Sequence, residues 1–137
     1  MNSSAMGTFV FIVAVLAAIA FAWMRGRKSP LYREIAARKV LDADAIRIER
    51  EERYTLDPQT TRDVLRGLGV ALELDAGRLR LDDNLGELWD MNPHAGFHQR
   101  ATFETWLVKR YRKLPDDFAP ETVAQLIAAL QRMPLVR

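Results

Sequence analysis

The sequence predicts an all-α protein, with a single N-terminal transmembrane helix followed by a small helical bundle. Three observations carry this expectation. All 20 Lys and Arg and all 18 Asp and Glu residues lie after residue 24, so the first part of the chain has no charged side chain. In the remainder, apolar residues recur at the three- and four-residue spacing of amphipathic helices. The apolar fraction of 49% is that of an ordinary folded protein.

The uncharged stretch, residues 6–24, is predicted to be the transmembrane helix. Its 19 residues would extend roughly 28 Å at about 1.5 Å per residue, close to a hydrocarbon thickness of about 30 Å. Residues 1–5 contain no Lys or Arg, so the positive-inside rule predicts a short extracytoplasmic N-terminus and a cytoplasmic C-terminal domain. The expected location is the inner (plasma) membrane, crossed once. The expected membrane-interface anchors after the span are Trp23, Arg25, Arg27 and Lys28.

Two other interpretations of this stretch are weaker. A cleaved signal peptide has a basic n-region and an apolar core of about 7–15 residues. The first is missing here and the second is exceeded, although Ala18 and Ala20 fit a small-residue cleavage pattern. A buried core helix would have to be covered on every side by the rest of the chain. We therefore expect an uncleaved anchor.

The next segment, residues 25–56, is predicted to be a basic flank and a charged helical stalk. Ser29 and Pro30 are a typical N-cap and first helical residue, which indicates a helix over about 30–41. The stretch after it is highly charged, and positions Ala45, Ile48 and Glu52 give it a thin stripe at best. The alternation from Ile46 to Glu49 would also suit a strand, so helix and strand both remain open for residues 43–53.

Residues 57–137 are predicted to form the small cytoplasmic helical domain. Asp57 and Pro58 indicate a helix start, and Gly67 and Gly69 its end. The apolar face expected between them consists of Thr61, Val64, Leu65 and Leu68. The connection that follows is rich in leucine and predicts either a short hairpin, 72–74 with 79–81, or a loop held by its leucines.

Two more helices complete the expected bundle. One spans about 97–113 and ends in a basic run before Pro115. The other opens near Pro120, and its apolar stripe is Val123, Leu126, Ile127 and Leu130. The aromatic residues most simply assigned to the core are Trp89, Phe97, Phe103 and Trp106. If they instead faced solvent as a cluster, they would form a site for docking a partner.

Within residues 57–132 several motifs appear in a fixed order. Residues 79–85 place leucines around two aspartates and an asparagine, residues 107–117 end a helix before an acidic turn, and residues 121–127 read Glu-Thr-Val-Ala-Gln-Leu-Ile. This layout resembles the acyl carrier protein fold, and more narrowly the carrier-like proteins of the DUF1493 type. The resemblance implies a first helix, a long loop, a second helix, a short third element and a last helix.

The chain differs from that family at the residue that carries the family's chemistry. The resemblance implies an Asp-Ser-Leu motif at the start of the second helix, where the serine carries phosphopantetheine. That position falls near Phe97 and His98, and no serine follows Ser29 in the chain. Thr102 is the nearest hydroxyl, one turn later. Carrier chemistry therefore does not transfer, and an unusual acyl carrier or lipid-handling accessory protein stays an alternative.

No catalytic or cofactor site is predicted, and we expect no enzyme. The absence of Cys excludes disulfides, thiolate metal sites and a Cys nucleophile. Asp90, His94 and His98 are spaced four residues apart and could line a metal-binding helix face, but Pro93 and Gly96 would break that helix. A small metalloprotein using His94 and His98 is thus the weakest alternative. The acidic loop of Asp82, Asp83, Glu87 and Asp90 is expected to be solvated or to cap helices.

The basic run is the one predicted partner-docking surface, formed by Lys109, Arg110, Arg112 and Lys113. It could contact anionic lipid, or it could be an exposed helix end neutralised by Asp116 and Asp117, which the charge pattern favours. Tethering to a bilayer disfavours nucleic acid. The sequence therefore predicts a membrane-anchored, non-catalytic binding or scaffold module that contacts membrane lipid and a protein partner.

Overall fold

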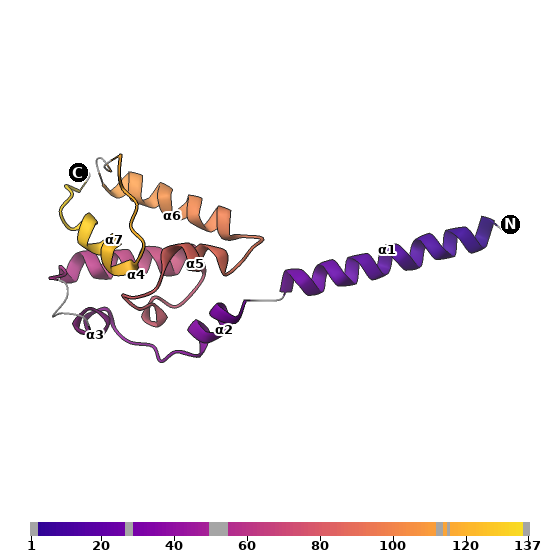
Figure 1. Cartoon of the computed structure of the whole chain (residues 1–137), viewed down its shortest axis with the longest axis horizontal. Coiled ribbons are helices and arrows are strands. Elements are labelled where there is room, and N and C mark those ends of the chain that lie inside the picture. Colours follow the sequence, from indigo (N-terminus) through magenta and orange to yellow (C-terminus); the bar gives the residue numbers. More distant parts are fainter. Residues whose placement is uncertain (1–2, 27–28, 50–54, 112–113, 115, 136–137) are drawn as a thin grey trace.

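The computed structural model describes residues 3–26, 29–49, 55–111, 114 and 116–135. Over these residues the chain is all-helical, with seven α-helices, one 3-10 turn and no strand, as predicted. Figure 1 shows α1 (Ser3–Gly26) as a rod that extends away from the other helices. Among the described residues, no helix is both long enough and apolar enough to pass through a membrane.

The segment predicted as a solvated stalk is instead part of the packed domain. Ser29 caps α2 (Pro30–Ala37), its hydroxyl accepting a 3.2 Å hydrogen bond from the backbone N–H of Tyr32. Ile35 of α2 and Ile46 of α3 (Ala43–Ile48) are completely buried and belong to the core. The prediction that this segment is solvated was wrong, because two of its isoleucines are buried in the core despite the charges around them.

The geometry of α3 also settles the ambiguity over residues 43–48, which are helical. Asp42 caps the helix by accepting a 2.7 Å bond from the backbone N–H of Ala45. Ile46 faces inward, whereas Ile48, placed on the predicted stripe, is exposed. Glu52 and the rest of residues 50–53 lie outside the described residues. The domain boundary at residue 57 stays a prediction, although the core already includes residues before it.

The central helix is α4 (Pro58–Leu72), which contacts α3, α6 and α7. It starts as predicted, with Asp57 accepting a 2.8 Å bond from the backbone N–H of Thr60. It does not end at Gly67 or Gly69 but continues to Leu72. Glu73 then adopts the left-handed conformation with φ 57°, and its N–H reaches the last carbonyls of the helix. Packing of its apolar face evidently outweighs the low helix propensity of two glycines.

The long connection after α4 is a loop held by its leucines and not a hairpin. It contains the turn η1 (Ala76–Arg78) and the short helix α5 (Leu85–Asp90), and its buried leucines are Leu79, Leu81, Leu85 and Leu88. Three backbone hydrogen bonds of 2.8–3.1 Å join residues 81–85 to residues 121–124. The loop end and the start of the last helix therefore lie side by side.

The remaining two helices close the bundle, as Figure 1 shows. In α6 (Gly96–Arg110), Phe103 and Leu107 are buried, as is Tyr111 just after it. Phe97, assigned to the core from the sequence, is 89% exposed and is a correction. The helix α7 (Val123–Leu130) buries the whole predicted stripe, Val123, Leu126, Ile127 and Leu130.

Candidate functional site

An apolar surface of the domain lies where α4 and α6 pack together. We call it the Trp106 face. It has two hollows, of about 280 Å³ and about 290 Å³, which share Trp106 and Arg110. The first lies between the two helices, and the second continues beyond α6 to Leu135. The residues that form the face are Asp63, Arg66, Gly67, Val70, Ala71, Thr102, Trp106, Lys109, Arg110 and Leu135.

The floor of the face is set by one glycine and a run of aromatic rings. A Cβ at Gly67 would lie 3.2 Å from the Trp106 ring, so the hydrogen of glycine leaves room for the indole to lie against α4. The ring stacks on Phe103 with centroids 5.5 Å apart, and Tyr111 meets it edge-on at 6.3 Å. Trp106 is thus half-buried and held from three sides, while Val70 beside it is 72% exposed.

Charge on this face is predominantly positive. Arg110 forms an ion pair with Asp63 of α4, and its guanidinium lies over the Trp106 ring at 5.9 Å. The hydrogen bond that Arg110 donates to the Asp63 carboxylate raises the pKa of Arg110 above its ordinary value. Arg66 and Lys109 are exposed at the α4 and α6 margins and have no ion pair with any described residue. Within the described part of the chain, the face therefore offers two cations that form no ion pair, on either side of an apolar floor.

This arrangement bears on the predicted docking surface. Lys109 and Arg110 do lie on the Trp106 face, but Arg112 and Lys113 fall outside the described residues. Arg110 is neutralised by Asp63 on another helix, and not by the expected Asp116 and Asp117. The face is completed by Arg66 and Val70 of α4 and by Leu135 near the C-terminus. They were not found from the sequence because both segments lie far along the chain from the basic run on α6.

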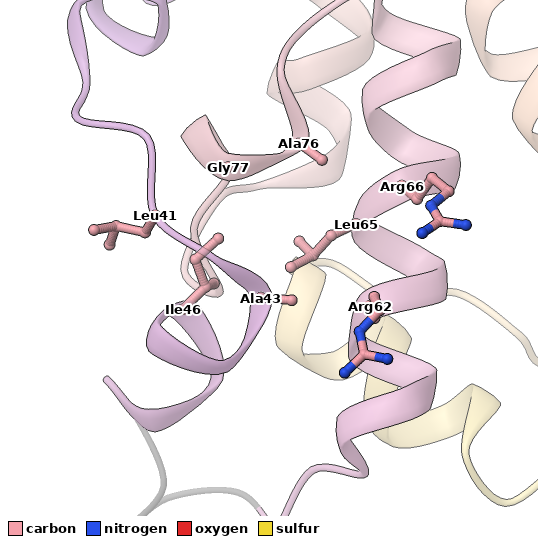
Figure 2. Close-up of a pocket in the computed structure, with 8 residues that line it drawn as sticks. All are labelled: Leu41, Ala43, Ile46, Arg62, Leu65, Arg66, Ala76 and Gly77. Atoms are coloured by element: carbon pink, nitrogen blue, oxygen red, sulfur yellow. The ribbon is translucent and has the colours of Figure 1, made fainter.

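A smaller apolar hollow of about 210 Å³ lies between α3 and α4. Figure 2 shows Ile46 and Leu65 facing the same gap, with the guanidinium group of Arg66 turned away from it. Gly77 closes the gap at a close approach, since a Cβ there would lie 2.5 Å from a methyl group of Val40. This hollow is a packing gap under the α2–α3 segment.

A group that sequence reasoning missed holds that segment in place. We call Arg38, Arg78, Arg80 and Asp83 the arginine clasp. Asp83 accepts 2.8 Å bonds from the Arg38 guanidinium and from the backbone N–H of Arg80. The Arg80 guanidinium reaches the Lys39 carbonyl at 2.6 Å, and Arg78 donates to the Ala36 carbonyl. The hydrogen bond to Asp83 raises the pKa of Arg38. Asp83 was expected to be solvated or capping, but it is an anchor for a distant cation.

The residues considered for a metal site do not share a helix face. Asp90 ends α5, His94 lies in the turn that follows, and His98 lies in the first turn of α6. No group of three or more His, Cys, Asp or Glu suited to a metal occurs among the described residues. The predicted helix break at Pro93 is present, because residues 91–95 form turns between α5 and α6. Gly96 does not break a helix but is the first residue of α6.

The remaining sequence-based sites concern the membrane and the carrier resemblance. The expected interface anchors Trp23, Arg25, Arg27 and Lys28 have side chains outside the described residues. Phe97 and His98, to which the resemblance assigns the serine position, are exposed in the first turn of α6. Comparison of the chain with protein-family models, with curated proteins and with solved structures finds no match.

Proposed function

We propose that the chain is a membrane-anchored, non-catalytic binding module. In this proposal residues 6–24 cross the inner (plasma) membrane once, and the helical domain presents the Trp106 face to a protein partner in the cytoplasm. The supporting observation is the solvent exposure of the apolar side chains of α1. Every side chain described in it, from residue 4 to residue 20, is exposed, although none is charged. Exposed Phe9, Phe11, Leu16 and Ile19 would be unfavourable in water and favourable in hydrocarbon.

The helix order supports a carrier-like domain as part of the same proposal. A first helix, a long loop and a second helix correspond to α4, the leucine-held connection and α6, and α7 is the last helix. The short helix α5 at the end of the loop is an addition to the pattern. The short third element has no helical counterpart among the residues described between α6 and α7. Because no hydroxyl stands at the expected serine position, we propose binding without a phosphopantetheine arm. Intact mass after incubation with a phosphopantetheinyl transferase should therefore stay unchanged, and a gain of one arm would favour the acyl carrier instead.

The anchor and its orientation can be tested because the chain contains no Cys. Single-cysteine variants Ser4→Cys and Arg132→Cys report on the two ends with a membrane-impermeant maleimide. We expect the full-length protein to resist alkaline carbonate extraction. In intact cells whose outer barrier is permeable to the reagent, Ser4→Cys should label and Arg132→Cys should label only after lysis. Release by carbonate, or the opposite labelling pattern, would contradict the anchor or its orientation.

A further inference from the structure

We propose that the Trp106 face binds an acidic amphipathic helix of a partner protein. The inference rests on the proposed function and names the chemistry of the partner. Partner helices of this kind place apolar side chains in a groove and leave charged residues at its margins. The argument depends on the shape of the face, on its charge and on how firmly its centre is held.

The shape favours a polypeptide over a single lipid tail. The face has two hollows of similar volume separated by Trp106 and Arg110, and it is not one closed cavity. Two apolar side chains on one side of a helix could enter the two hollows together, whereas an acyl chain is held best by one enclosed cavity. Val70 and Leu135, which are 72% and 49% exposed, stand one at each hollow and would both be covered.

The charge selects an acidic partner. Of the described residues that line the two hollows, Asp63 is the one carboxylate, and it forms an ion pair with Arg110. Arg66 on α4 and Lys109 on α6 keep their charge without a carboxylate partner among the described residues. Carboxylates spaced along both flanks of a bound helix would pair with cations that stand on two different helices. A basic peptide would meet repulsion at both positions.

The centre of the face is held before any partner arrives. Trp106 is fixed by Gly67, by Phe103 and by Tyr111, and Arg110 by Asp63. Tryptophan and arginine are the residues most often found at the energetic centre of interfaces. An anchor that is already ordered loses little side-chain entropy on binding. The site is thus suited to a partner that supplies apolar anchors and acidic flanks.

The test uses the full-length chain in nanodiscs of uncharged phosphatidylcholine and a labelled synthetic peptide. The peptide is a helix of about 16 residues with Leu at positions spaced by three and four and Glu elsewhere, and its control has Lys in place of Glu. We expect saturable binding of the acidic peptide by fluorescence anisotropy and much weaker binding of the basic one. Failure of the acidic peptide to saturate, or equal binding of both peptides, would overturn the proposal.

Variants identify the surface that binds. We expect Arg66→Glu with Lys109→Glu to weaken the acidic peptide at least about tenfold, and Val70→Asp to do the same, since all three side chains are exposed. Lys39→Glu and Ile48→Asp make the same kinds of change at exposed positions away from the face, and should leave the affinity unchanged. Equal losses in both sets would assign the binding to general charge and not to this face.

Anionic lipid is the competing occupant. Hydrogen exchange of residues 66–71 and 102–110 should be the same in nanodiscs with and without phosphatidylglycerol, and should slow only when the acidic peptide is added. Slower exchange with phosphatidylglycerol alone would overturn the proposal in favour of a lipid contact. Carbonate extraction depends on α1 and peptide binding on α4 and α6, so failure of the anchor and failure of this inference are distinguishable.

Discussion

The helices α1 and α7 are both almost entirely apolar, yet their surroundings are opposite. In α7 the five residues Val123, Ala124, Leu126, Ile127 and Leu130 are at most 1% exposed. In α1 the large apolar side chains described are 40–68% exposed. The shorter helix has one apolar stripe that the domain can cover, whereas the longer one is apolar on every side. Apolar composition thus does not decide burial, because a core has room only for a face of the right size.

Part of the core comes from the charged segment that was predicted to be solvated. The segment of α2 and α3, between α1 and α4, provides Ile35 and Ile46, which are completely buried. The arginine clasp also ties this segment to the loop that follows α4. The most apolar part of the chain contributes no buried side chain among those described. This contrast between a self-contained domain and an uncovered helix can be tested by changing each side separately.

The largest effect should come from placing charge in α1. Val13→Arg with Leu16→Arg puts two cations in the middle of the proposed span, each costing about 2.5–3.5 kcal/mol of insertion free energy. We expect the double variant to be released by alkaline carbonate while its domain unfolds at the same temperature as before. The control Val13→Leu with Leu16→Val should stay in the membrane fraction. If the arginine variant also stays, residues 6–24 are not the anchor.

The second prediction concerns the α2–α3 segment. Ile46→Ala removes a completely buried side chain and should lower the free energy of unfolding by about 2–5 kcal/mol. Ile48→Ala, two residues later and 54% exposed, should change it by less than about 0.5 kcal/mol. Urea unfolding of the full-length protein, followed by tryptophan fluorescence, measures both. If both variants lost equally little unfolding free energy, the segment would be a solvated stalk as first predicted.

The arginine clasp predicts a somewhat smaller loss. Asp83→Ala leaves the Arg38 guanidinium and the backbone N–H of Arg80 without their acceptor, which should cost about 2–3 kcal/mol of unfolding free energy. The exposed Asp90→Ala is the matched control and should be nearly neutral. The same unfolding experiment decides between them. A neutral Asp83→Ala would mean that the isoleucines alone hold the segment.

Trp106 should contribute to stability less than a core residue does. It is half-buried, so Trp106→Ala should cost about 1–3 kcal/mol, below the roughly 3–5 kcal/mol of a fully buried tryptophan. Phe97→Ala, at an 89% exposed side chain, should cost under about 0.5 kcal/mol. Thermal unfolding compares the two variants. A loss above the predicted range would place Trp106 in the core and weaken the case for an open face.

The smallest effect belongs to the cap of α4 and has a defined pH dependence. The backbone N–H of Thr60, then its hydroxyl, donate to Asp57 and lower the pKa of that carboxyl. Because the pKa of Asp57 is lower in the folded than in the unfolded chain, its ionised carboxylate stabilises the fold at pH values above the unfolded pKa of about 3.9. This stabilisation is lost as the pH falls through the lower pKa of the folded state. Asp57→Ala should cost about 1 kcal/mol at neutral pH.

Asp57→Asn provides the control, because asparagine caps a helix without titrating. The stability difference between the native protein and this variant should narrow only below about pH 4. A difference that stays constant down to strongly acidic pH would show that the hydrogen bonds do not favour the ionised carboxylate.

Local signals in the chain predicted much of the fold. The caps at Ser29 and Asp57 begin helices as expected, and the last apolar stripe is buried in full. The end of α4 was predicted too early, because two glycines suggested a stop where packing continues the helix. Phe97 was placed inside because aromatic residues usually are, but it falls on the outer side of α6. Periodicity identifies a face only when the neighbouring helices are known.

The sequence by itself determined the all-α class, the separation of an uncharged leader from a charged domain, and the helix starts, because these depend on residues close together in the chain. Only the tertiary structure decided which charged segment enters the core and which cations come together around Trp106. Ile46 with Leu65, Asp83 with Arg38, and Arg110 with Asp63 are partners 19 to 47 residues apart. Contacts over such distances depend on how whole helices pack, and no local pattern encodes them.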